Sequence, residues 1–184
     1  RADYCLWELE RLLKYIVYPE DVACIYMEPV MGEGGYVVPD KKFVQGVAKI
    51  CKEHGILLIF DEIQCGYGRT GKMWASQHFD VIPDIMTVGK AIAGGLPMSA
   101  VISTPEIMDK WPIGTHGTTF GGNPVAAAAG CVVLDQYKDG TLLAHVNEMG
   151  AYLKEKLTLL MKKYPCISDV RGVGLMIAIE FSHE

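Results

Sequence analysis

Three charged residues follow short apolar segments of this sequence. Glu28 and Asp61 come directly after such segments, and Lys90 follows a third across Gly89. Each segment has the length and the composition of a buried strand. Because the carboxyl ends of strands line the ligand crevice of an open α/β sheet, these groups could converge on one bound molecule. Taken singly, each is also typical of a solvated turn.

The residues after Asp61 contain a partial nucleotide-binding pattern. Residues 66–72 spell GxxxxGK, but Met73 stands where a serine or threonine would bind magnesium. A P-loop also precedes its Walker B aspartate along the chain, whereas this pattern closely follows Asp61. The sequence therefore argues against an NTPase.

The same glycines, Gly66, Gly68 and Gly71, fit the pattern GxGxxG. In a dinucleotide-binding fold the first of these glycines lies at the strand end. Here residues 61–65 separate it from the strand. We expect the glycines to form a sharply turning loop instead.

Hydrophobic spacing predicts alternating helices and strands, with a boundary near Gly140. The alternation is typical of an α/β sheet, followed by a smaller C-terminal part. Asp40 should cap one helix and Gly55 should end it, while Asn123 should cap another. Further helices are predicted over residues 6–17, 125–137 and 142–163, and strands over residues 22–27, 56–60, 85–88 and 100–103. Near the end of the chain, residues 171–174 are predicted to join strands 167–170 and 175–179 as a hairpin or a strand bend.

Composition and charge exclude several classes of protein. Half of the 184 residues are apolar, the net charge is −5, and the basic residues are spread along the chain. Binding to nucleic acid or to an anionic membrane is therefore not expected. The apolar runs are shorter than the roughly 18 residues of a membrane span, and no signal peptide opens the chain, so we expect a cytoplasmic protein.

The six cysteines lie far apart, without a CxxC pair or a histidine at metal-binding spacing. We therefore predict no metal site and no disulfide scaffold, and reduced thiols that mostly serve packing. The chain starts at Arg1 rather than at a methionine and stops just after an apolar segment. We expect it to be an internal piece of a longer protein.

Four runs of sequence closely resemble the pyridoxal-phosphate-dependent class III aminotransferases, which include 4-aminobutyrate, ornithine and acetylornithine aminotransferases. In order, the runs are EPVMGEGG (residues 28–35), LLIFDEIQCGYGRTG (57–71), TVGKAIAGGLP (87–97) and TTFGGNP (118–124). A fifth, DVRGVGLMIAIE (169–180), resembles the entry into the C-terminal domain of that family, so the resemblance covers nearly the whole chain.

The resemblance implies an α/β protein of the transferase fold type I that binds pyridoxal phosphate (PLP). Residues 1–140 would form part of the large PLP-binding domain, with a mixed, mostly parallel sheet flanked by helices. Residues 141–184 would supply the connecting long helix and the start of the small C-terminal domain.

Roles for four residues follow from the same resemblance. Lys90 would form the Schiff base with the cofactor aldehyde and would later shuttle a proton. Asp61 would lie against the pyridine nitrogen and keep it protonated, which makes the ring an electron sink. Ile63 would press on the ring face, and Gln64 would bind near the phenolic oxygen. Ordinary core packing is the competing interpretation of Ile63.

Three further residues are matched at the substrate and the subunit boundary. Thr119, with its neighbour Thr118, would reach the phosphate of the cofactor in the neighbouring subunit, which implies a homodimer with shared sites. Glu33 matches a carboxylate that pairs with an arginine while a 4-amino or 5-amino substrate is bound, and releases it to hold the α-carboxylate of glutamate. That arginine, the phosphate-binding Ser-Gly-Thr loop and the ring-stacking aromatic residue of the family have no match in this sequence.

The resemblance favours a transaminase that moves an amino group from an ω-amino compound or amino acid to a 2-oxo acid. Racemases, epimerases and aminomutases of the same family use the same lysine chemistry, so the reaction type stays open. A third alternative follows from the unmatched segments: these 184 residues could be a catalytically inert folded or assembly module.

Overall fold

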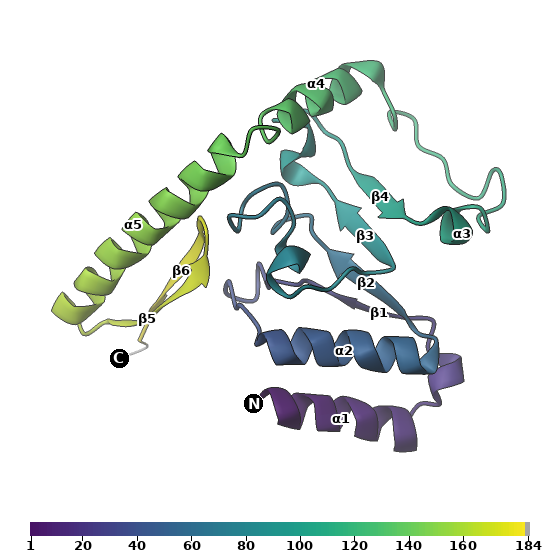
Figure 1. The fold of residues 1–184 in the computed structure, drawn as a ribbon, viewed down its shortest axis with the longest axis horizontal. Helices are drawn as coiled ribbons and strands as arrows, with labels where there is room; N and C mark the ends of the chain where they lie inside the picture. Colours follow the sequence, from purple (N-terminus) through teal and green to yellow (C-terminus); the bar gives the residue numbers. More distant parts are fainter. Residues whose placement is uncertain (183–184) are drawn as a thin grey trace.

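The structure is a computed structural model that describes residues 1–182. Within this part of the chain, β1 (Cys24–Met27), β2 (Leu57–Asp61), β3 (Ile85–Val88) and β4 (Ala100–Ser103) form one sheet in that order (Figure 1). β1, β2 and β3 run parallel, and β4 runs antiparallel to β3. The predicted mixed, mostly parallel α/β sheet is confirmed. The carboxyl ends of β1, β2 and β3 therefore meet at one edge.

Helix α2 (Lys41–His54) packs against the sheet, and α1 (Ala2–Tyr15) packs against α2 (Figure 1). The side chain of Asp40 accepts a hydrogen bond from the Lys42 amide at 2.8 Å, and Gly55 ends the helix in the left-handed conformation at φ 70°. Both ends of α2 are as predicted. The first helix starts earlier than predicted, at Ala2.

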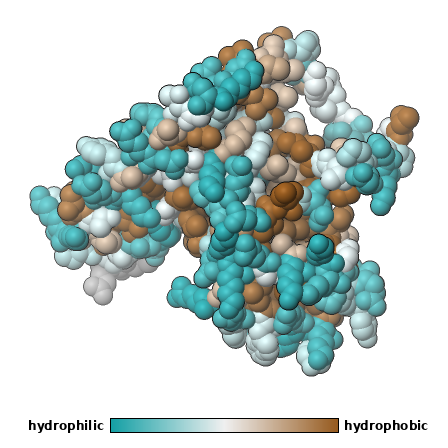
Figure 2. All heavy atoms as spheres, in the orientation of Figure 1, coloured by the Kyte–Doolittle hydropathy of each residue, from teal (hydrophilic) through white to brown (hydrophobic). Residues whose placement is uncertain are grey.

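One face of the sheet is packed and the other is largely open in this chain. Leu58 and Phe60 of β2 are buried in the core with α2, whereas Cys24 and Tyr26 of β1 are exposed. Figure 2 shows hydrophobic side chains at the surface among hydrophilic ones.

The prediction that most cysteines serve packing is wrong. Only Cys51 and Cys65 are buried among the described residues. The exposed cysteines are Cys5, Cys24, Cys131 and Cys166.

The C-terminal part contains α4 (Pro124–Asp135), the long helix α5 (Thr141–Lys163) and a hairpin of β5 (Ile167–Val173) and β6 (Met176–Phe181) that packs against α5 (Figure 1). Asn123 caps α4 as predicted, by accepting a hydrogen bond from the Ala126 amide. The division of the chain at Gly140 stays a prediction. No helix of residues 1–182 has both the length and the apolar character that crossing a membrane requires.

The structure corrects the predicted connection between the last two strands. Residues 171–173 belong to β5, because pairing continues as far as Val173 opposite Met176, and only two residues remain for the turn. Four short elements were not predicted, since they are too short to show hydrophobic periodicity. They are η1 (Pro19–Asp21), η2 (Ala75–His78), η3 (Lys90–Ala93) and α3 (Pro105–Met108).

Candidate active site

Asp61 and Lys90 lie at the carboxyl ends of two neighbouring strands, β2 and β3. Asp61 is the last residue of β2 and is paired with Thr87 of β3, while Lys90 opens the 3₁₀ helix η3 just beyond β3. This placement agrees with the convergence expected from the sequence. The lysine amine and the carboxylate are therefore presented at the position where open α/β sheets bind ligands.

The backbone of Lys90 is held in an uncommon conformation. Its φ is 46°, in the left-handed region that residues with a Cβ rarely occupy. The Lys90 ammonium donates a hydrogen bond to Oε1 of Gln64 at 2.7 Å. Strain of this kind costs about 1–3 kcal/mol and concentrates at functional sites. A lysine retained at such a position points to a role beyond stability.

Both oxygens of the Asp61 carboxylate accept hydrogen bonds. Oδ1 accepts from the Ile63 amide at 2.9 Å, and Oδ2 accepts from the Tyr26 hydroxyl at 2.6 Å. The Tyr26 oxygen also lies 3.3 Å from Oγ1 of Thr87. These contacts fix the orientation of the carboxylate.

Ile63 and Gln64 lie on the segment that connects Asp61 to the glycine loop. Ile63 packs beside Gly89, and Gln64 contacts Lys90. A Cβ placed on Gly89 would be 3.4 Å from Cγ2 of Ile63, so the Ile63 side chain packs beside the backbone that carries Lys90. Besides accepting from Lys90, Gln64 donates to the Tyr36 hydroxyl at 3.4 Å. The structure thus brings together Asp61, Ile63, Gln64 and Lys90 of the predicted site.

No hydrogen bond among residues 1–182 joins the other three predicted residues to this cluster. Glu33 is exposed on a turn of the loop between β1 and α2. Thr118 and Thr119 are exposed in the segment before α4, and no hydrogen bond found among the described residues joins them to Lys90 or Asp61. A role for the two threonines at another subunit stays a prediction.

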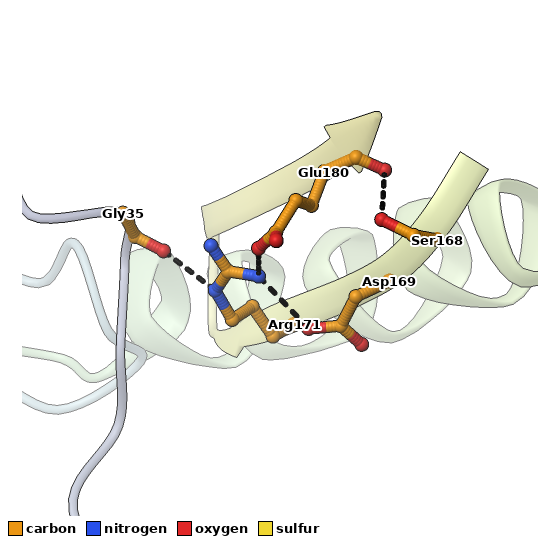
Figure 3. A network of polar contacts seen from close by, with 5 residues as sticks. All are labelled: Gly35, Ser168, Asp169, Arg171 and Glu180. Atoms are coloured by element: carbon orange, nitrogen blue, oxygen red, sulfur yellow. Dashed lines mark hydrogen bonds and ion pairs between the residues drawn. The ribbon is translucent and has the colours of Figure 1, made fainter. Parts of the chain in front are cut away.

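Arg171 attaches the C-terminal hairpin to the loop that carries Glu33 (Figure 3). Its Nε donates to the Gly35 carbonyl at 2.7 Å, and its Nη1 donates to Asp169 at 2.9 Å and to Glu180. The two carboxylates hold the guanidinium in place, and their hydrogen bonds raise the pKa of Arg171 above its ordinary value. The loop between β1 and α2 is therefore fixed from the C-terminal side of the chain.

The glycine-rich segment behaves as a tightly packed turn. Gly68 and Gly71 have positive φ, and the Gly71 carbonyl accepts a hydrogen bond from Nδ2 of Asn147 in α5 at 2.8 Å. A Cβ on Gly71 would fall 2.1 Å from the side-chain oxygen of Asn147. The loop is followed by the short η2 rather than by a nucleotide-binding helix. The interpretation of these glycines as turn residues is confirmed.

Glu62, next to Asp61, is a fully buried carboxylate with a structural role that the sequence did not indicate. Its Oε2 accepts from the Ala75 amide at 2.8 Å, and its Oε1 accepts from the Ser76 amide at 2.7 Å. The side chain thus ties the start of η2 to the end of β2. Burial raises the pKa of Glu62, while the two backbone amides oppose this by stabilising the carboxylate.

Replacing Glu62 with glutamine is expected to lower the free energy of unfolding of the intact protein by about 1–3 kcal/mol, because one backbone amide would then face an amide nitrogen instead of an oxygen. Urea denaturation measures this loss. The exposed Glu148→Gln is the matched control and should unfold like the wild type.

The pH dependence of the same variant has a definite sign. Because the folded-state pKa of Glu62 is the higher one, its contribution to stability is fully present below the unfolded value and is lost as pH rises through the folded value. The difference in free energy of unfolding between wild type and Glu62→Gln should therefore narrow as pH rises above about 4, the ordinary range of a glutamate. A difference that widens as pH rises would contradict the raised pKa.

Together these features define an α/β protein whose sheet edge presents a lysine and an anchored aspartate. The Aminotransferase class-III family model matches residues 1–184, so the chain belongs to that family of enzymes. The family identified from the sequence motifs is confirmed. The fold type is confirmed as well, because solved structures of PLP-dependent aminotransferases superpose on it.

Three relatives illustrate the similarity. The chain is 47% identical to a probable 4-aminobutyrate aminotransferase of Bacillus subtilis over 89% of its own length and 38% of the relative. It is 45% identical to a leucine/methionine racemase of Thermococcus litoralis, over 89% and 37% respectively. A taurine:2-oxoglutarate aminotransferase from Bifidobacterium kashiwanohense, solved in complex with PLP and glutamate, superposes with a TM-score of 0.92 at 36% identity, covering 98% of this chain and 41% of that one.

The chain thus spans about two fifths of the length of these relatives.

The sequence analysis assigned no role to three residues that shape the site, namely Tyr26, Tyr36 and Arg171. Arg171 lies within the run of residues 169–180 that resembles the family, but its contact was not foreseen. Each of the three acts through a partner that is distant along the chain, and no local signal shows such a contact.

Proposed function

We propose that the intact protein is a PLP-dependent transaminase that moves an amino group from an ω-amino compound to a 2-oxo acid. The observation that carries the proposal is the pairing of a strained lysine with an anchored aspartate at one sheet edge, within a chain of the class-III family. Further support comes from a neighbour at TM-score 0.92 that was solved with PLP and glutamate.

The residues present fit PLP in their chemistry. The Lys90 amine is the group that bonds to an aldehyde, and Asp61 is an acceptor for a protonated ring nitrogen. The apolar side chain of Ile63 suits a ring face, and the amide of Gln64 suits a phenolic oxygen. When bound, PLP supplies an electron sink for the carbanion that forms at the substrate Cα.

Each residue of the chain then has a defined task. Lys90 Nζ would hold the cofactor covalently and, when free, would move the proton that leaves the substrate Cα. Asp61 would keep the ring nitrogen protonated. Gln64 holds the Lys90 ammonium at 2.7 Å and so orients it toward the cluster.

Substrate and assembly belong to the same proposal. Glu33 would bind an arginine of the intact protein while an ω-amino donor is present. Thr118 and Thr119 would bind the cofactor phosphate of a partner subunit in a homodimer, which their exposure before α4 allows. We place the enzyme in the cytoplasm.

A second candidate function is amino acid racemisation, which is favoured by the 45% identity to a leucine/methionine racemase. Both reactions need a base at the substrate Cα, and Lys90 would serve in either. They differ in whether nitrogen leaves the substrate.

One experiment separates these alternatives. The intact protein is loaded with PLP and given 4-aminobutyrate, ornithine or 5-aminovalerate with 2-oxoglutarate, and glutamate formation is measured. Glutamate formation is the expected result. Interconversion of L- and D-leucine without any oxo acid, and without glutamate formation, would overturn the transaminase proposal. Failure of PLP to bind a folded protein would instead support an inert module.

A further inference from the structure

The hydroxyl of Tyr26 donates a hydrogen bond to Oδ2 of Asp61, an oxygen that accepts from no backbone amide of residues 1–182. The O–O distance is 2.6 Å, which is short for a hydroxyl-to-carboxylate hydrogen bond and typical of a strong one. Oδ1 of Asp61 is held by the Ile63 amide of its own segment. Tyr26 is therefore the side chain that fixes the second oxygen.

This contact is built across three adjacent strands. Tyr26 is paired with Ile59, two residues before Asp61, so Tyr26 and Asp61 lie on the same face of the sheet in a diagonal relation. The 2.6 Å hydrogen bond shows that the Tyr26 side chain spans this diagonal. Thr87, paired directly with Asp61, lies 3.3 Å from the Tyr26 oxygen. Because the tyrosine proton goes to Asp61, the Thr87 hydroxyl is left to donate to Tyr26.

In this chain Tyr26 makes its specific contacts through its hydroxyl. Its side chain is 54% exposed here and lies on the same face of the sheet as Asp61. Desolvation of the hydroxyl and its hydrogen bond to Asp61 raise the pKa of Tyr26, so it remains a donor at neutral pH.

We infer that Tyr26 is a positioning residue for the cofactor ring: its hydroxyl, supported by Thr87, fixes the Asp61 carboxylate in the orientation that holds the protonated ring nitrogen of PLP. The inference rests on the proposed function, since it takes Asp61 as the partner of that nitrogen. It adds a residue of β1 to a site otherwise formed by β2, β3 and the segments that follow them.

The first measurement needs no cofactor. The ionisation of tyrosines in the intact apoprotein is followed by ultraviolet absorbance as pH rises. The difference between the titrations of the wild type and of Tyr26→Phe is the signal of Tyr26. In Asp61→Ala this signal should titrate at lower pH, because the acceptor is gone. An unchanged titration would mean that the two side chains do not interact, and the inference would be wrong.

The second measurement uses PLP itself. In Tyr26→Phe the dissociation constant for PLP is expected to rise about three- to tenfold, as the loss of one hydrogen bond predicts. When Asp61→Ala is already present, adding Tyr26→Phe should change the dissociation constant for PLP less than twofold, because the carboxylate through which Tyr26 acts is absent. The exposed Tyr18→Phe is the matched control and should bind PLP like the wild type.

A spectroscopic readout distinguishes positioning of the carboxylate from a general loss of structure. The ¹⁵N resonance of bound ¹⁵N-labelled PLP reports protonation of the ring nitrogen. In Tyr26→Phe it should move toward the value of the unprotonated ring, because an unfixed carboxylate spends less time at that nitrogen. If Tyr26→Phe matched the wild type in both the ¹⁵N resonance and the affinity for PLP, the inference about Tyr26 would be wrong, while the proposed function would stand. A wild-type protein that binds no PLP would overturn the proposed function, and the role of Tyr26 with it.

Discussion

Replacing Lys90 with alanine in the intact protein is expected to abolish covalent trapping of PLP and to lower transaminase kcat/KM by at least about 10³- to 10⁴-fold. Under the proposed function, the amine at this position would be both the point of attachment and the base that moves the substrate proton. Borohydride reduction followed by peptide mass spectrometry should find one label per chain, on the peptide that contains Lys90. The variant should carry none.

Two comparisons make this result specific. Lys110→Ala removes another exposed lysine and should leave labelling and activity unchanged. Circular dichroism should show that Lys90→Ala is folded. Labels scattered over several lysines in the wild type, or equal labelling in the variant, would remove Lys90 from the proposed role.

The strained backbone of Lys90 adds a prediction about stability. At φ 46° a side chain with a Cβ is disfavoured and glycine is not. Lys90→Gly is therefore expected to unfold with a free energy about 1 kcal/mol higher than Lys90→Ala, because relief of strain outweighs the flexibility that glycine adds to the unfolded chain. Denaturation of the two variants under the same conditions measures the difference. If alanine were equally stable, the backbone at this position would not be strained.

Local features of the sequence predicted a large part of the fold. Asp40 and Gly55 mark the ends of α2 because a side-chain cap and a left-handed glycine act within a few residues. The convergence of Asp61 and Lys90 followed from one general rule about parallel sheets, namely that strand ends share an edge. The roles given to the individual residues came from the resemblance and not from that rule.

The rest depends on contacts between distant parts of the chain. Tyr26 reaches Asp61 only because β1 and β2 pair in one particular register, which no local pattern fixes. Arg171 meets the Gly35 carbonyl across 136 residues, and its placement follows from how the hairpin packs. The sequence predicts a turn or bend at residues 171–173, because Gly172 interrupts the apolar pattern. In the structure, strand pairing extends through these residues. Tertiary contacts decided each of these cases.

Asp61→Asn is expected to separate the attachment of PLP from its chemistry. Asparagine fits the position, because its Oδ1 can still accept from the Ile63 amide and its Nδ2 can donate to the Tyr26 oxygen. The fold and the trapping of PLP on Lys90 should therefore persist. The negative charge is lost, so under the proposed function the ring nitrogen would no longer have a partner that keeps its proton.

The expected loss in kcat/KM is about 10²- to 10³-fold, the effect typical of removing one preorganised electrostatic partner of a transition state. Activity with 2-oxoglutarate measures the loss, and borohydride trapping measures attachment in the same preparation. Asp109→Asn, an exposed substitution, is the control. If activity fell while trapping stayed stoichiometric, the charge of Asp61 would act on the reaction and not on binding. If both stayed at the wild-type level, Asp61 would not be the partner of the ring nitrogen, and the lysine would have to act without it.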